Sequence, residues 1–145
     1  MGKCLVLIGP SGSGKTTFTE KFLKDNPSFK VVSDEIVRKY YFGVTMKLSD
    51  KLEKDLVNDL VYKYLAQGLD VIVDGGPIKA RDRKSLLNYI GKIEDAQISC
   101  VEFVTPLEVC KERTSLKKRD FEKNCNAYQS PSISEGWHGI MRYSE

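Results

Sequence analysis

The residues from position 9 to position 16 combine three glycines with a lysine and a threonine at a fixed spacing. They read GPSGSGKT, which satisfies the pattern G-x-x-x-x-G-K-[ST]. Glycines in such a segment let backbone N–H groups converge on an anion, and the N-terminus of a following helix adds partial positive charge. The spacing therefore predicts a loop that holds the phosphates of a nucleoside triphosphate.

The expected contacts of this loop divide between backbone and side chains. We expect Lys15 to bridge the β- and γ-phosphates and the Thr16 hydroxyl to be a ligand of Mg²⁺. The residues predicted to bind the nucleotide are Gly9, Ser11, Gly12, Ser13, Gly14, Lys15, Thr16 and Thr17. A glycine-rich turn with an unrelated lysine is the alternative, and the strand predicted before the loop and the helix predicted after it argue against that alternative.

Hydrophobic patterning predicts that strands alternate with helices along the chain. Continuous apolar runs followed by turn residues predict buried strands, and apolar residues at helical spacing predict helices. The strands are expected over residues 3–8, 29–33, 69–74 and 98–104, and the helices over residues 15–24, 34–40, 49–67, 79–90 and 107–119. This alternation predicts an α/β fold with a parallel β-sheet sandwiched between helices.

Acidic residues follow two of the predicted strands. Asp34 and Glu35 come after the second strand, and Asp74 ends the third. The carboxyl ends of parallel strands lie near the phosphate loop, where a carboxylate can accept the proton of a hydroxyl that attacks the γ-phosphorus. The alternatives are structural, with Asp34 as a helix N-cap and Asp74 as a strand terminator. If functional, Asp74 holds a magnesium-bound water or orients the acceptor.

Motifs of triphosphate hydrolases are missing from the sequence. Motor ATPases carry a glutamate beside the strand-end aspartate, whereas here Asp74 is followed by Gly75-Gly76-Pro77. The N-K-x-D and D-x-x-G elements of GTPases do not occur either. The pattern favours phosphoryl transfer to an alcohol over hydrolysis.

Length and composition predict one globular domain over residues 1–145, with a net charge of +3. No apolar run is long enough to span a bilayer, and the first is too short for the core of a signal peptide. The four cysteines form no C-x-x-C pair and there is one histidine, which predicts reduced thiols and no zinc cluster. We therefore expect a cytoplasmic protein with no membrane contact.

Several segments together resemble the kinase domain of 5′-polynucleotide kinases, P-loop enzymes that phosphorylate the 5′-hydroxyl of DNA or RNA. The similar segments are IGPSGSGKTTFTEKFLKDNPSF, VVSDEIVRKYYFG, VIVDGGP, FVTPLEVCKER and YQSPSISEGWHGI, and they cover nearly the whole chain. The loop is common to many kinases, whereas its combination with the Asp34 segment and the P-x-x-x-E-G ending is more specific. The resemblance implies a single P-loop kinase domain that uses ATP and Mg²⁺, with a nucleic acid 5′ end as acceptor.

The resemblance also implies roles on the acceptor side. Asp34 would be the general base, and Arg38 would hold the acceptor or its phosphate. In the family the base lies three residues before this arginine, whereas Asp34 lies four before Arg38, so Glu35 stays open as the base. The aromatic residues at 40–42 could stack an acceptor base or belong to the core.

A lid helix is implied near residues 111–119, where five cationic residues face one acid. Arg113 corresponds to the first arginine of this lid, which clamps the donor phosphates. Lys117 is the expected second cation, and Lys118 and Arg119 are alternatives. A solvated basic face is the competing interpretation. For the ending at Trp137, packing under the nucleotide base and completion of the sheet both stay open.

Two other functions fit the same motifs. The acceptor could be the hydroxyl of a nucleoside, a sugar or an antibiotic, or the protein could bind nucleotide without turnover. The sequence indicates neither the donor base nor the oligomeric state.

Overall fold

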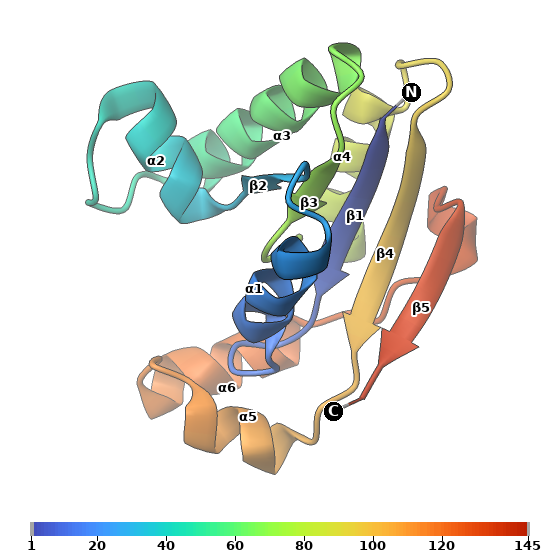
Figure 1. Cartoon of the computed structure of the whole chain (residues 1–145). Coiled ribbons are helices and arrows are strands. Elements are labelled where there is room, and N and C mark those ends of the chain that lie inside the picture. The colour runs from blue at the N-terminus through green and yellow to red at the C-terminus, as the bar shows by residue number, and fades with distance from the viewer. Residues whose placement is uncertain (1, 145) are drawn as a thin grey trace.

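The computed structural model describes residues 2–144, and its centre is a five-stranded β-sheet (Figure 1). The strands are β1 (Lys3–Ile8), β2 (Lys30–Val32), β3 (Val71–Val73), β4 (Gln97–Phe103) and β5 (Gly139–Tyr143). They lie in the order β2-β3-β1-β4-β5, and every neighbouring pair is parallel. The predicted α/β fold with a parallel sheet between helices is confirmed.

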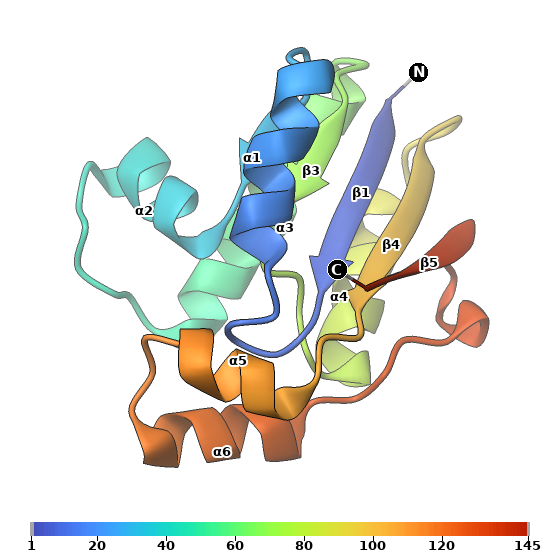
Figure 2. The same ribbon diagram turned by 60° about the horizontal axis from the view of Figure 1, so that its bottom comes forward.

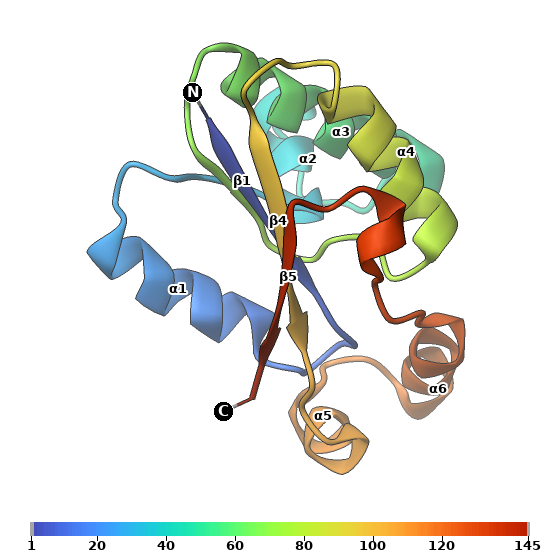
Figure 3. The ribbon, with the colours of Figure 1, turned by 90° about the vertical axis from the view of Figure 1, so that its right-hand side faces the viewer.

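Helices cover both faces of this sheet. Those between residues 2 and 144 are α1 (Lys15–Asp25), α2 (Asp34–Phe42), α3 (Asp50–Ala66), α4 (Ala80–Ile90), α5 (Leu107–Arg113), α6 (Lys118–Ala127) and the short 3₁₀ helix η1 (Ile133–Glu135). An edge-on view shows α1 on one face and α3 and α4 on the other (Figure 3). Helices α5 and α6 lie beyond the end of the sheet, next to the loop between β1 and α1 (Figure 2). None of the helices in the described part of the chain is long and apolar enough to cross a membrane.

The central strand β1 is buried on both faces because its side chains alternate between two apolar clusters. Val6 and Ile8 belong to the larger cluster, to which α3 and α4 also contribute. Leu7 belongs to the cluster on the α1 side. Burial of both faces explains why this strand reads in the sequence as a continuous apolar run.

Aromatic contacts fix α1 on its face of the sheet. Phe18 packs edge-on against Phe103 with ring centroids 5.5 Å apart, and against Tyr143 at 5.2 Å. Phe22 lies 5.9 Å from Phe18 and 4.9 Å from Phe29. Because α1 begins at Lys15, these contacts set the position of the lysine relative to β1.

Helix α2 is capped by Ser33, which rules out the alternative that Asp34 is its N-cap. The Ser33 hydroxyl accepts a hydrogen bond from the Ile36 N–H at 3.2 Å, and its backbone is extended, as an N-cap requires. Asp34 is the first residue of the helix instead. Its carboxylate is therefore not used for capping.

The helix predicted over residues 107–119 is broken, which corrects the sequence-based assignment. Helix α5 ends at Arg113, and α6 begins at Lys118. At the break, the Thr114 hydroxyl accepts a hydrogen bond from the Leu116 N–H at 3.1 Å and contacts the Ser11 hydroxyl at 2.7 Å. A threonine side chain that bonds nearby backbone competes with the helical hydrogen bonds, and this ends α5.

The C-terminal segment completes the sheet, which settles one question that the sequence left open. Trp137 is buried in the larger apolar cluster, and β5 pairs with β4 directly after it. Glu135 anchors this segment, because Arg83 donates to both of its carboxylate oxygens at 2.9 Å and Trp137 donates its indole N–H at 3.0 Å. Arg83 is fully buried and also donates to the carbonyls of Pro77 and Ile78.

We expect Arg83→Met to destabilise the protein by about 3–5 kcal/mol, because it leaves the Glu135 carboxylate unpaired in a nearly buried site. Urea unfolding of the wild type and the variant measures the difference. Arg81→Met on the exposed face of the same helix is the matched control and should change the free energy of unfolding by less than about 0.5 kcal/mol. Equal effects of the two substitutions would contradict the assignment of the pair.

Candidate active site

The predicted phosphate-binding loop, residues 9–16, connects the carboxyl end of β1 to the first turn of α1. Gly12 and Gly14 have φ angles of +83° and +101°, a region that side chains with a Cβ rarely adopt. Gly14 is the N-cap of α1 and offers no side-chain acceptor, so the first N–H groups of the helix are not capped by it. Such N–H groups are the donors with which a loop of this kind binds an anion.

The loop packs closely against α5 and α6. A Cβ on Gly12 would lie 2.3 Å from the Cys110 carbonyl oxygen, so only glycine fits there. The Asn124 side-chain oxygen accepts a hydrogen bond from the Ser11 N–H at 3.0 Å, and the Thr105 hydroxyl donates to the Ser13 carbonyl at 2.8 Å. The sequence did not indicate Asn124, Thr105 and Thr114, because no motif marks a side chain that supports a loop from a distant part of the chain.

Lys15 lies over the loop and donates to the carbonyls of Gly9 and Pro10 at 2.7 and 2.8 Å. Its ammonium is also 3.3 Å from the Ser13 hydroxyl. Desolvation lowers the pKa of Lys15 to about 8, and the nearby charge of Asp74 opposes this shift in part. The loop carbonyls thus hold the Lys15 amine beside the loop, and its contact with the β- and γ-phosphates stays a prediction.

Thr16 and Asp74 meet, although they are distant in sequence. The Thr16 hydroxyl donates to a carboxylate oxygen of Asp74 at 3.1 Å, because β3 ends beside β1. Desolvation raises the pKa of Asp74, while the Thr16 hydrogen bond and Lys15 lower it. The pair supplies the hard oxygen atoms that Mg²⁺ prefers. Thr17, the next residue of α1, is exposed.

The two acids at the start of α2 have different surroundings. Partial burial raises the pKa of the Asp34 carboxyl, Glu53 raises it further, and Arg38 and Lys47 oppose the shift. Asp34 is nevertheless an exposed residue, as Glu35 is. Glu35 is mostly exposed and lies 3.4 Å from the Lys39 ammonium. Of the two acids, Asp34 is therefore the one surrounded by other charged groups of the protein.

Arg38 forms an ion pair with Glu53 on α3, with Nε 2.5 Å from one carboxylate oxygen. Burial would raise the pKa of Glu53, but the bonds from Arg38 and from the Leu48 N–H outweigh it and lower the pKa. Two of the five guanidinium donors of Arg38 bond to Glu53. Glu53 was missed in the sequence because it is an ordinary acid in a helical pattern.

The two residues predicted for the lid lie on either side of the break between α5 and α6. Arg113 ends α5, and Lys117 precedes α6; both are exposed, and both flank Thr114, which contacts the loop.

Tyr40 and Phe42 are exposed, whereas Tyr41 packs against the core and donates a hydrogen bond to Asp59. The aromatic cluster thus divides between surface and core.

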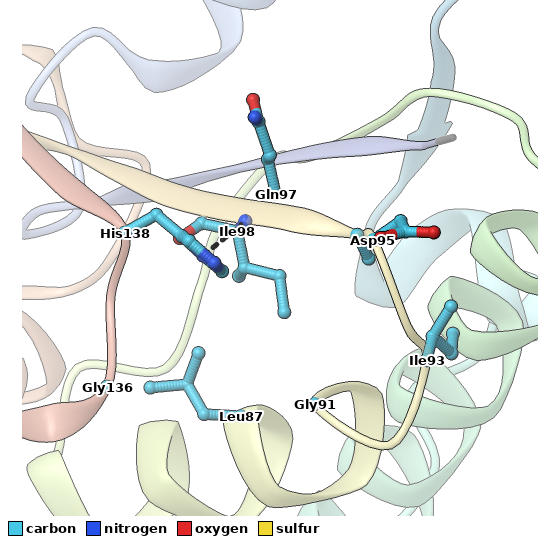
Figure 4. A pocket seen from close by; sticks show the side chains of 9 residues that line it. Leu87, Gly91, Ile93, Asp95, Gln97, Ile98, Gly136 and His138 are labelled. Carbon is cyan, nitrogen blue, oxygen red and sulfur yellow. Dashed lines mark hydrogen bonds between the residues drawn. The ribbon is translucent and has the colours of Figure 1, made fainter.

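A cavity of about 510 Å³ lies at the end of the sheet where β4 begins, opposite to the edge that carries the glycine loop (Figure 4). Its lining includes Leu87, Gly91, Ile98 and His138, at the end of α4 and the beginning of β4. None of the predicted site residues lines it. We therefore place the candidate active site at the carboxyl ends of the strands and not in this cavity.

The fold and the loop together define a nucleotide-binding protein of the P-loop kinase class. A family model described as an AAA domain matches residues 5–129, and the chain belongs to this family. The resemblance to P-loop kinases predicted from the sequence is thereby confirmed. No curated protein matches the chain.

Solved structures share this fold at low sequence identity. Kti12 from Chaetomium thermophilum in complex with ADP-AlF3 matches with a TM-score of 0.76 at 16% identity, covering 97% of this chain and 88% of that one. A fungal RNA kinase matches with a TM-score of 0.73 at 15% identity, covering 98% of this chain and 38% of that one. A gluconokinase from Sinorhizobium meliloti 1021 matches with a TM-score of 0.60 at 18% identity, covering 98% of this chain and 82% of that one. These identities show a common fold and leave the acceptor open.

We expect Gly12→Ala to destabilise the protein more than Gly43→Ala. Both glycines have positive φ, so each alanine pays a similar backbone cost of about 1–2 kcal/mol. A Cβ on Gly43 would have nothing within 4 Å, whereas on Gly12 it would collide with α5. The collision should add about 1–3 kcal/mol in urea unfolding. Equal losses would mean that the loop does not pack on α5.

We also expect the stability of the Lys15→Met variant relative to the wild type to decrease as pH rises. With a pKa of about 8 in the folded protein against an ordinary 10.5, Lys15 makes the wild type more stable as pH climbs through this interval. Methionine lacks this titration. The free energy of unfolding of the variant minus that of the wild type should therefore be largest below pH 8 and decrease toward pH 10.5. A difference independent of pH, measured by urea unfolding, would contradict the lowered pKa.

Proposed function

We propose that the protein transfers the γ-phosphoryl group of ATP to the 5′-hydroxyl of a polynucleotide, with Asp34 as the general base. The observation that carries this proposal is the state of Asp34. Its carboxylate is at the first turn of α2, does not serve as the helix cap, is accessible to solvent, and has a raised pKa. A structural role as a cap, which would have explained this acid without chemistry, is thus removed.

In the proposed reaction the acceptor oxygen attacks the γ-phosphorus as its proton passes to Asp34. A new O–P bond forms, the bond between the γ-phosphorus and the β–γ bridging oxygen breaks, and ADP leaves with the electron pair. A carboxylate with a raised pKa is a stronger base than an ordinary carboxylate. The raised pKa of Asp34 therefore suits this role better than that of an ordinary surface acid.

The donor side of the proposal rests on the loop. Its backbone N–H groups and Lys15 would bind the β- and γ-phosphates. Thr16 and Asp74 have the oxygen donors to hold Mg²⁺ or its bound water, and the ion would neutralise charge on the phosphates. Arg113 and Lys117, beside the loop-contacting Thr114, would clamp the donor phosphates from the lid.

The acceptor side is supported by the Arg38–Glu53 pair. Glu53 fixes the guanidinium through two bonds, which orients the remaining donors toward an anionic group without a large loss of side-chain entropy. Arg38 would use them to hold a phosphate of the acceptor. The similarity of the fold to a fungal RNA kinase agrees with a nucleic acid acceptor.

A small-molecule acceptor is the second candidate, because the fold is also shared with a gluconokinase of similar length, of which this chain covers 82%. Salt distinguishes the two acceptors. Binding to a polyanion weakens steeply as salt rises, whereas binding to a neutral sugar or nucleoside does not.

Asp34→Asn is expected to lower phosphoryl transfer by about 10²–10⁴-fold, because the amide cannot accept the hydroxyl proton. The readout is transfer of label from γ-labelled ATP to single-stranded DNA and RNA with 5′-hydroxyl ends, in the presence of Mg²⁺. Affinity for ATP, measured by calorimetry, should not change, since the proposed role of Asp34 is toward the acceptor hydroxyl, whereas Lys15 and Thr16 bond to the loop and to Asp74.

Glu35→Gln is the matched control, because it removes the neighbouring carboxylate by the same chemical change. It should retain most of the activity. The reverse result, with Glu35→Gln inactive and Asp34→Asn active, would move the base to Glu35. Labelling of a sugar or nucleoside in place of every oligonucleotide would overturn the polynucleotide acceptor.

A further inference from the structure

The outer face of α4 carries a shallow groove outside the candidate active site. Its volume is about 390 Å³. Six residues line it: Arg81, Lys84, Ser85, Asn88, Tyr89 and Lys92. At about 1.5 Å of rise per residue, the helical span from Arg81 to Tyr89 is about 12 Å, and Lys92 follows the end of α4.

The groove presents positive charge without an acidic neighbour in its lining. Arg81, Lys84 and Lys92 are all exposed. Ser85 and Asn88 lie between them and add uncharged hydrogen-bonding groups that suit phosphate and sugar oxygens. Cations that alternate with short polar side chains along a concave surface match the backbone of a nucleic acid strand better than a single small anion.

Two acids near the groove have cationic partners. Asp82 of α4 lies 2.8 Å from the Lys54 ammonium of α3. Asp59 of α3, which the Tyr89 hydroxyl approaches at 3.5 Å, lies 3.1 Å from the Lys63 ammonium. Asp95, on the connection to β4, lines the separate cavity at the far end of the sheet. Asp82 and Asp59 are therefore paired with lysines that do not line the groove.

The groove begins at the edge of the sheet where the candidate active site lies. Lys54, which pairs with Asp82 in the first turn of α4, is adjacent in the chain to Glu53, which holds Arg38. The first turn of α4 is also tied to the end of α6 by the bond from the Ala80 N–H to the Gln129 side chain at 2.8 Å. The first turns of α3 and α4 thus connect the Arg38 site to the groove.

We propose that this groove binds the phosphate backbone of a single-stranded nucleic acid, downstream of the nucleotide that carries the reacting 5′-hydroxyl. Arg81, Lys84 and Lys92 contact successive phosphates, and Tyr89, 39% exposed, offers the edge of its ring to a base. The use of the groove as an acceptor track rests on the proposed kinase activity, whereas its affinity for a single strand does not.

The test compares Lys84→Gln/Lys92→Gln with the wild type by fluorescence anisotropy of a labelled oligonucleotide of about 12 nucleotides, as DNA and as RNA. The control is Lys21→Gln/Lys24→Gln on α1, which removes the same charge from exposed positions on the other face of the sheet. We expect the groove variant to bind about tenfold more weakly. The slope of log K against log salt should fall by about 1.4, because each phosphate contact to a single strand contributes about 0.7.

The same variants separate the groove from the proposed function. If the groove variant and the α1 control bind the oligonucleotide alike, the groove proposal is overturned. If only the groove variant loses affinity, but no variant or wild type phosphorylates a 5′-hydroxyl, the groove stands and the proposed function fails. If transfer occurs, the groove variant should raise KM for the long oligonucleotide while KM for a nucleoside 3′-monophosphate and for ATP stay unchanged.

Discussion

The position of β1 between β3 and β4 is the constraint on which the rest of the molecule depends. Parallel pairing on both sides brings three carboxyl ends to one edge of the sheet, so the glycine loop, Asp74 and Thr105 arise next to one another. Each strand is short, and α1 holds the arrangement from one face through aromatic contacts. A shift of one residue in β1 would turn its buried side chains to the opposite faces and move the loop away from Asp74.

Buried carboxylates fasten the segments that surround this edge. Each accepts hydrogen bonds from an arginine on a different element, so that burial of the acid becomes tolerable only when both elements are in place. The pairs are Glu53 with Arg38, Glu135 with Arg83, and Glu102 with Arg142. The Glu102 carboxylate also accepts hydrogen bonds from Tyr128 and Ser130, which ties the end of α6 to β4. The active-site edge is therefore defined by charge pairing as well as by packing.

The glycine loop contacts the α5–α6 pair directly, so the proposed phosphate site and the proposed lid lie against each other. Gly12 touches the last turn of α5, and Ser11 bonds to side chains on both sides of the helix break. The break itself arises from Thr114, whose hydroxyl bonds to backbone and to Ser11. An unbroken helix over residues 107–119 would carry Asn124 away from the loop. The basic residues of the segment acquire their position from the break.

The sequence alone determined the features that depend on local periodicity and on one short motif. Buried strands, the first four helices, the glycine loop with Lys15 and the family follow from contiguous residues, because backbone geometry and apolar spacing act within a few positions. Tertiary structure decided which acids lose their solvent and pair with arginines, and that Thr114 contacts Ser11 of the glycine loop. These contacts join groups from distant parts of the chain, whose contact energies no local pattern encodes. The Ser33 cap and the Thr114 bond to the Leu116 N–H are local, but Asp34 is also a favoured capping residue, so residue type alone did not separate it from Ser33.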